Sequence, residues 1–156
     1  MEIDANRFMR MALQEASKAA NEDEVPIGCV IVKDNKVISK GHNRREYKKD
    51  VTSHAEIEAI RKANKKLGDW QLVNCDLYVT IEPCIMCMGA IIQSHIRNVY
   101  YGSVDPKGGA TGSSINVLDA KGLNHYPNIQ GGILQEECSQ IIKNYFAQKR
   151  KNNKLG

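Results

Sequence analysis

The residues best suited to chemistry are a histidine, a glutamate and two cysteines in two short segments. His54 and Glu56 lie in His54-Ala55-Glu56, and Cys84 follows Glu56 by 28 residues in the segment Pro83-Cys84-Ile85-Met86-Cys87. One imidazole and two thiolates are common zinc ligands, and three protein ligands leave the fourth position of a tetrahedral zinc ion open to water. Because zinc lowers the pKa of a bound water to about 7, these residues predict a hydrolytic zinc centre.

Two predicted helices can bring these side chains together. One helix is expected to begin at Ser53 or His54 and to end near Leu67, before Gly68. Pro83 opens a second helix, at a position where its missing N–H costs nothing. Residues three apart share a helix face, so both cysteine sulfurs can reach one ion. The positive end of the helix dipole also favours the thiolate form that binds metal.

Other interpretations of these residues remain open. The two cysteines of Cys-x-x-Cys could form a redox pair, although the surrounding sequence lacks a thioredoxin-like pattern. Ser53 and Glu56 form an S-x-x-E capping box, in which Glu56 would accept the backbone N–H of Ser53 instead of carrying protons. A structural zinc site would need a fourth ligand, and the candidates are His42, Cys75, His95 and His125.

The pattern of the remaining chain predicts alternating helices and strands. Amphipathic helices are expected at 6–21 and from Leu134 through Phe146, and loops at 41–53 and 102–114. The second loop lacks the phosphate-binding G-x-x-x-x-G-K-[ST] pattern. Strands are expected at 27–32, 36–39, 77–80, 98–101 and, shorter, within 129–133. These elements predict an α/β fold, a three-layer α/β/α sandwich with a five-stranded mixed sheet, in a single domain over residues 1–156.

Composition favours a cytoplasmic protein. Five cysteines are an odd number and do not suggest a disulfide framework. No apolar run approaches the roughly 18 residues of a membrane span, and the acidic start Met1-Glu2-Ile3-Asp4 does not resemble a signal peptide. We therefore expect no membrane association.

Positive charge is concentrated at the C-terminus. The chain carries a net charge of +4, and residues 143–154 contain five basic residues and no acidic one. This basic tail, about 147–156, predicts a polyanionic partner, with a frayed and solvated terminus as the alternative. Arg44, Arg45, Lys48 and Lys49 could extend the basic surface into a phosphate-binding rim, or could form a solvated loop.

The spacing H-x-E…P-C-x-x-C is that of zinc-dependent nucleobase deaminases. From about Phe8 to Phe146 the chain resembles the bacterial tRNA-specific adenosine deaminases. The segments that carry the resemblance are Glu24-Val25-Pro26-Ile27-Gly28, Gly41-His42-Asn43, His54-Ala55-Glu56, Leu77-Tyr78-Val79-Thr80-Ile81-Glu82-Pro83-Cys84, Asp105-Pro106-Lys107-Gly108-Gly109 and Leu123-Asn124-His125. The resemblance implies a cytidine deaminase-like fold, one Zn²⁺ per subunit, a homodimer, and conversion of the wobble adenosine of an arginine tRNA anticodon stem-loop to inosine with release of ammonia.

The resemblance also implies a role for individual residues. Zinc would be held by His54, Cys84 and Cys87, while Glu56 would move protons from water to the base and to the leaving ammonia. The remaining residues would contact RNA. They are Asn43 with Pro26, Ile27 and Ala55 at the flipped base, Asp105 and Lys107 in the RNA groove, Asn124 and His125 at the anticodon backbone, and Arg150 with Tyr145 and Phe146 at flanking nucleotides.

Simpler explanations exist for several of these residues. Asn43 could hold a turn, because asparagine tolerates left-handed backbone. Tyr145 and Phe146 fall on the apolar face of the last predicted helix, where core packing would account for them. Two other functions also stay open. A deaminase of a free base or nucleoside would need no basic rim, and an RNA-binding module with a structural zinc site would need a fourth protein ligand.

Overall fold

Helices and strands alternate along the chain in a computed structural model that describes residues 4–155. The strands are β1 (Gly28–Lys33), β2 (Lys36–His42), β3 (Cys75–Ile81), β4 (Asn98–Ser103) and β5 (Asn128–Gln130). The helices are α1 (Ala5–Asn21), α2 (Arg45–Lys48), α3 (Ala55–Leu67), α4 (Ile85–Gln93) and α5 (Gln135–Leu155), with a 3-10 turn at Val117–Asp119. None of the described helices is long and apolar enough to span a membrane. The expectation about a signal peptide rests mainly on residues 1–3, which lie outside the described part.

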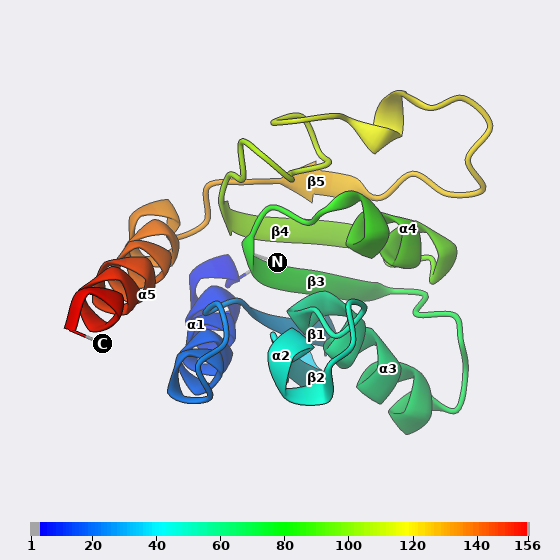
Figure 1. The fold of residues 1–156 in the computed structure, drawn as a ribbon. Helices are drawn as coiled ribbons and strands as arrows, with labels where there is room; N and C mark the ends of the chain where they lie inside the picture. Colours follow the sequence, from blue (N-terminus) through cyan, green and yellow to red (C-terminus); the bar gives the residue numbers. More distant parts are fainter. Residues whose placement is uncertain (1–3, 156) are drawn as a thin grey trace.

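All five strands form one mixed sheet in the order β2-β1-β3-β4-β5 (Figure 1). Strand β1 pairs antiparallel with both β2 and β3, whereas β4 pairs parallel with β3 and β5. Helices cover both faces: α1 and α5 pack against each other on one side, and α3 and α4 on the other. The predicted three-layer sandwich with a five-stranded mixed sheet is therefore confirmed.

The sheet is apolar on both faces because each face is covered by helices. Along β1, Cys29 and Ile31 belong to the core beneath α3 and α4, while Val30 and Val32 belong to the core beneath α1 and α5. Strand β3 alternates in the same way, since Leu77 faces the first core and its neighbour Tyr78 the second. This burial explains the nearly continuous apolar runs in the sequence of both strands.

Three elements differ from the sequence prediction. The predicted loop 41–53 contains the four-residue helix α2, and β5 is shorter and begins one residue earlier than expected. Helix α5 continues through the basic tail to Leu155, so the tail is helical and not frayed, although residues 150–154 are exposed as that interpretation expects. Core packing of Tyr145 and Phe146 is also wrong, because Tyr145 is half-buried and Phe146 is 41% exposed.

Gly28 allows α1 to lie directly against β1, which gives a test of this packing. A Cβ built on Gly28 would come within 1.9 Å of the Ala12 carbonyl oxygen in α1. Because that oxygen belongs to helix backbone, we expect Gly28→Ala to destabilise the protein by about 2 kcal/mol or more. Gly89 is the matched control, because it is exposed in α4 and a Cβ added there would meet open space. Gly89→Ala should instead stabilise by about 0.5–1 kcal/mol, and urea unfolding of both variants measures the difference.

Candidate metal centre and substrate cleft

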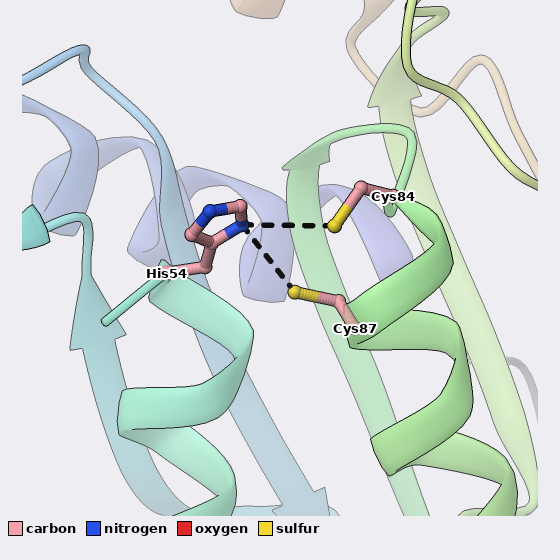
Figure 2. A group of neighbouring side chains, drawn as sticks. All are labelled: His54, Cys84 and Cys87. Atoms are coloured by element: carbon pink, nitrogen blue, oxygen red, sulfur yellow. Dashed lines mark hydrogen bonds between the residues drawn. The ribbon is translucent and has the colours of Figure 1, made fainter. Parts of the chain in front are cut away.

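The three predicted metal ligands meet at the start of two neighbouring helices (Figure 2). His54 is the N-cap of α3, Cys84 is the N-cap of α4, and Cys87 lies in the first turn of α4. The Nδ1 atom of His54 lies 3.7 Å from the Cys84 Sγ and 3.6 Å from the Cys87 Sγ. Tetrahedral zinc with ordinary Zn–N and Zn–S bonds separates such atoms by about 3.6 Å. The donor atoms and their spacing therefore fit a zinc ion.

The surroundings of these ligands favour one thiolate. Hydrogen bonds from Cys87 and His54 lower the pKa of the Cys84 thiol to about 4 although the group is partly buried. The same contacts act in the opposite direction on the two donors, because the hydrogen bond to Cys84 raises the pKa of His54 and of Cys87. The Cys84 thiolate therefore accepts hydrogen bonds from two donors. A metal cation can bind the thiolate in place of those protons.

Glu56 lies beside the ligands and is not used as a helix cap. Its side chain is 3% exposed in the first turn of α3, and burial, reinforced by the charge of Cys84, raises the pKa of Glu56 to about 7. The backbone N–H of Ser53 donates instead to the Asp50 carbonyl at 3.1 Å. The capping-box interpretation is therefore wrong, and the carboxyl group is left beside the metal ligands.

The four candidates for a fourth metal ligand are engaged elsewhere. His42 contacts the carboxylates of Glu22 and Glu15, and His125 hydrogen-bonds the Ile96 carbonyl at 2.6 Å. His95 packs against His125, and Cys75 is buried at the start of β3. Within residues 4–155, the group able to hold a metal ion consists of His54, Cys84 and Cys87 alone. A structural zinc site with four side-chain ligands is therefore not supported.

A cleft of about 450 Å³ lies between the α1–β1 connection, α2 and α5. Its lining residues are Glu22, Asp23, Glu24, Val25, Asn43, Arg45, Glu46, Tyr47, Tyr145, Phe146 and Lys149. Asn43 is 6% exposed, and its side-chain oxygen is buried without a hydrogen-bond partner. An unpaired buried acceptor is costly, so a hydrogen-bond donor that reached this oxygen would relieve that cost.

The predicted base-binding residues next to Asn43 are brought together by the sheet. The backbone N–H of Asn43 donates to the Ile27 carbonyl at 3.1 Å, and Pro26 directly precedes Ile27 and is buried. Ala55 is fully buried and lies between His54 and Glu56 in sequence. Asn43 therefore lies beside Ile27, whereas neither a metal ligand nor Glu56 lines the cleft itself. The binding role of these residues stays a prediction.

Two buried glutamates, Glu24 and Glu82, shape the surroundings of the site, and the sequence predicted no role for either. Glu24 accepts the backbone N–H groups of Glu46 at 3.1 Å and Tyr47 at 2.7 Å, which fixes α2 at the cleft. Glu82 accepts backbone N–H groups from Asp105, Thr111 and Ser113. For Glu82 the available signal was its position after a buried strand, and this position does not reveal partners so distant in sequence.

Other predicted RNA contacts are distributed unevenly. Lys107 and Arg150 are exposed, on the loop after β4 and on α5, and the Asp105 side chain accepts the N–H groups of Lys107 and Gly108 at 3.2 Å. Asn124 and His125 lie elsewhere, because His125 contacts Ile96, beyond the end of α4 opposite to Cys84. A nine-residue helix is about 14 Å long, so one chain does not bring these two residues to its own metal ligands.

The basic residues near α2 are partly neutralised by acidic partners. Lys48 binds Glu58 at 2.6 Å, and Arg44 binds Glu22 at 3.3 Å while it stacks over Tyr47. Arg45 lies 3.9 Å from a Glu46 carboxylate oxygen, and Lys49 is exposed. The predicted phosphate-binding rim is therefore narrower than the sequence suggests.

Comparison with known proteins identifies the class of this fold and site. The family model of the MafB19-like deaminases matches residues 3–150. A tRNA-specific adenosine deaminase from Agrobacterium fabrum is 46% identical over 143 residues, covering 92% of this chain and 94% of the relative. Another, from Streptococcus pyogenes serotype M3, is 43% identical over 148 residues, covering 95% of this chain and 86% of that relative. A solved structure from work on A-to-I editing by tRNA:A34 deaminases superposes with a TM-score of 0.84 at 46% identity, covering 86% of this chain and 98% of the other.

These similarities extend over nearly the whole chain, and the matched range 3–150 spans the positions of the metal ligands and Glu56. The chain belongs to the MafB19-like deaminase family and, within it, to the tRNA-specific adenosine deaminases. The resemblance stated from the sequence motifs is thereby confirmed.

Proposed function

We propose that the protein is a zinc-dependent hydrolase that converts the wobble adenosine of a tRNA anticodon, in an arginine tRNA, to inosine. The observation that carries the proposal is the site itself: three converging metal ligands, no fourth side-chain ligand among residues 4–155, and a buried carboxyl group beside them. Relatives named tRNA-specific adenosine deaminase support the substrate class.

Zinc is the metal that this donor set favours, with one ion per subunit. His54 would bind it through Nδ1, and Cys84 and Cys87 would bind it through their thiolates. When bound, a zinc ion acts as a Lewis acid and lowers the pKa of a coordinated water from about 15.7 to about 7.

Glu56 is the general acid and base of the proposed reaction. It takes a proton from water as oxygen attacks C6 of adenine, and it delivers a proton to the adjacent ring nitrogen. It then takes the proton of the new C6 hydroxyl group and gives it to the amino group, so that the C6–N bond breaks, ammonia leaves and the oxygen remains as the C6 carbonyl of inosine. Glu56 is suited to this role because its carboxyl group is buried, free of a capping duty and close to both cysteines.

The cleft and the basic helix α5 support a folded RNA as substrate. We place the enzyme in the cytoplasm. Asn43 would bind the flipped adenosine, and Lys107 and Arg150 would contact the RNA backbone and flanking nucleotides. Asn124 and His125 lie near the C-terminal end of α4, whereas the metal ligand Cys84 lies at its N-terminal end. Within one chain they are therefore too far away to reach the same adenosine. A homodimer, in which the partner presents them to the RNA, reconciles their position with their proposed role.

Asn43 offers a direct test of base binding. Since its side-chain oxygen has no partner inside the protein, Asn43→Ala should leave thermal stability nearly unchanged. We expect kcat/KM for the stem-loop to fall by about 10- to 100-fold, the value of one or two good hydrogen bonds. A large loss of stability with unchanged kinetics would instead support a structural turn at Asn43.

The decisive experiment uses the zinc-loaded protein and an arginine tRNA anticodon stem-loop with adenosine at the wobble position. The expected product is inosine at that position, with ammonia released in equal amount. Free adenosine, cytidine and guanine are tested in parallel. Turnover of a free compound without turnover of the stem-loop would indicate a small-molecule deaminase, and binding without any turnover would indicate a non-catalytic module.

A further inference from the structure

We propose that Glu82 is a positioning residue that fixes the loop 105–113 against the metal-binding helix, so that Asp105 and Lys107 are held in place for RNA. The inference rests on the proposed function, because it assumes that this loop contacts the substrate. Glu82 follows the last residue of β3 and precedes Cys84 by two positions, and it is 2% exposed.

The carboxylate of Glu82 is surrounded by donors from the loop. Its Oε1 atom accepts the backbone N–H of Asp105 at 3.1 Å, and its Oε2 atom accepts those of Thr111 at 3.0 Å and Ser113 at 3.2 Å. The hydroxyl groups of Thr111 and Ser113 donate to the same carboxylate. One side chain therefore binds both ends of the loop at once.

The loop is also tied directly to the segment that begins α4. The N–H of Ala110 donates to the Pro83 carbonyl at 2.9 Å, and Pro83 immediately precedes Cys84. Within the loop, the N–H of Gly109 donates to the Asp105 carbonyl at 2.8 Å. A Cβ on Gly109 would lie 2.3 Å from the Glu82 carboxyl carbon, so this glycine is needed for the close approach. The exposed Lys107 is consequently held at a fixed place relative to a metal ligand.

These contacts use the carboxylate oxygens of Glu82 as hydrogen-bond acceptors. All five neighbouring groups donate hydrogen bonds, and three of them are backbone N–H groups that cannot reverse direction. Glutamine has nearly the same shape, but in either orientation its NH₂ group would face a backbone N–H.

The test compares zinc-loaded wild type with Glu82→Gln on the anticodon stem-loop. We expect kcat/KM to fall by about 10- to 100-fold, which is the effect of misplacing a substrate contact by about 1 Å. Most of this loss should appear as a higher KM. At saturating stem-loop, kcat should stay within about threefold of wild type and zinc content near one ion per chain, because the metal ligands and Glu56 are unchanged. Hydrogen exchange at the amides of Thr111 and Ser113 should become faster.

Asp76→Asn is the matched control. Asp76 is another buried carboxylate, bound by Arg97 at 3.1 Å and Asn98 at 2.8 Å at the start of β4, the opposite end from the loop. This variant changes the charge by the same amount and should lower stability without raising KM. An equal rise of KM in both variants would show that loss of stability alone is responsible and would overturn the inference.

Gly109→Ala perturbs the same contact from the other side, because it displaces the Glu82 carboxylate without changing its chemistry. It should raise KM like Glu82→Gln, and the double variant should show less than the sum of the two effects. If Glu82→Gln does not fold, the KM of Gly109→Ala alone tests whether Glu82 positions the loop. Inosine formation by wild type tests the proposed function separately. If wild type is active while KM in both Glu82→Gln and Gly109→Ala stays within twofold of wild type, only the positioning role is refuted.

Discussion

Glu56→Gln should give a folded protein that binds zinc normally and has almost no deaminase activity. Glutamine preserves the size of the side chain but cannot carry protons, so we expect kcat to fall by about 10²- to 10⁴-fold. The reason is local: Glu56 is buried beside Cys84, and the Ser53 N–H that it might have capped is bound to Asp50. Single-turnover inosine formation, zinc analysis and thermal unfolding measure the three expectations.

Glu58→Gln provides the control for this result. Glu58 lies two residues further along α3 and is similarly buried, but its oxygens bind Lys48 at 2.6 Å and Arg61 at 3.4 Å. Loss of these ion pairs should cost stability and leave kcat close to wild type at temperatures where the variant is folded. Near-wild-type activity of Glu56→Gln would remove Glu56 from the proposed mechanism.

Cys87→Ser should abolish metal binding and, with it, activity. Cys87 is fully buried in the first turn of α4, and its Sγ lies 3.6 Å from the His54 Nδ1. A serine hydroxyl does not ionise near neutral pH and cannot replace a thiolate, so two ligands would remain. We expect zinc to fall from about one to below about 0.1 ion per chain and inosine formation to fall to background. Metal analysis after dialysis, together with activity, provides the measurement.

Cys75→Ala distinguishes this effect from the general loss of a buried cysteine. Cys75 is equally buried at the first residue of β3, but it is outside the metal-binding group. Its replacement should retain zinc and activity. If Cys87→Ser kept a full complement of zinc, the assignment of Cys87 as a ligand would be wrong.

The metal centre could be predicted from sequence because its geometry is encoded locally. Cys84 and Cys87 reach one ion through the spacing of a single helical turn, and His54 lies at the start of a second helix that the pattern also predicts. Only the contact between α3 and α4 had to be supplied by the fold. The same holds for the sheet, since alternating apolar residues in β1 and β3 mark two covered faces.

The features that could not be predicted depend on partners distant in sequence. Helix α2 is too short for a periodic signal, and its N-terminal N–H groups are bound by Glu24, more than twenty residues earlier. Glu82 finds its donors 23 to 31 residues later, in a loop without regular structure. The surface position of Phe146 was hidden for a similar reason, because sequence does not reveal how far α5 extends beyond the core.

The unbroken course of α5 to Leu155 has a thermodynamic consequence (Figure 1). Phe146, Arg150 and Lys154 recur every four residues, so they share one stripe of a rigid rod, while Lys149 anchors the rod to Asp23. A flexible arm would lose about 1–2 kcal/mol of backbone entropy for each residue immobilised on a phosphate-bearing partner. In α5 this entropy is lost during folding, so the cationic stripe would bind a phosphate-bearing partner without that further cost.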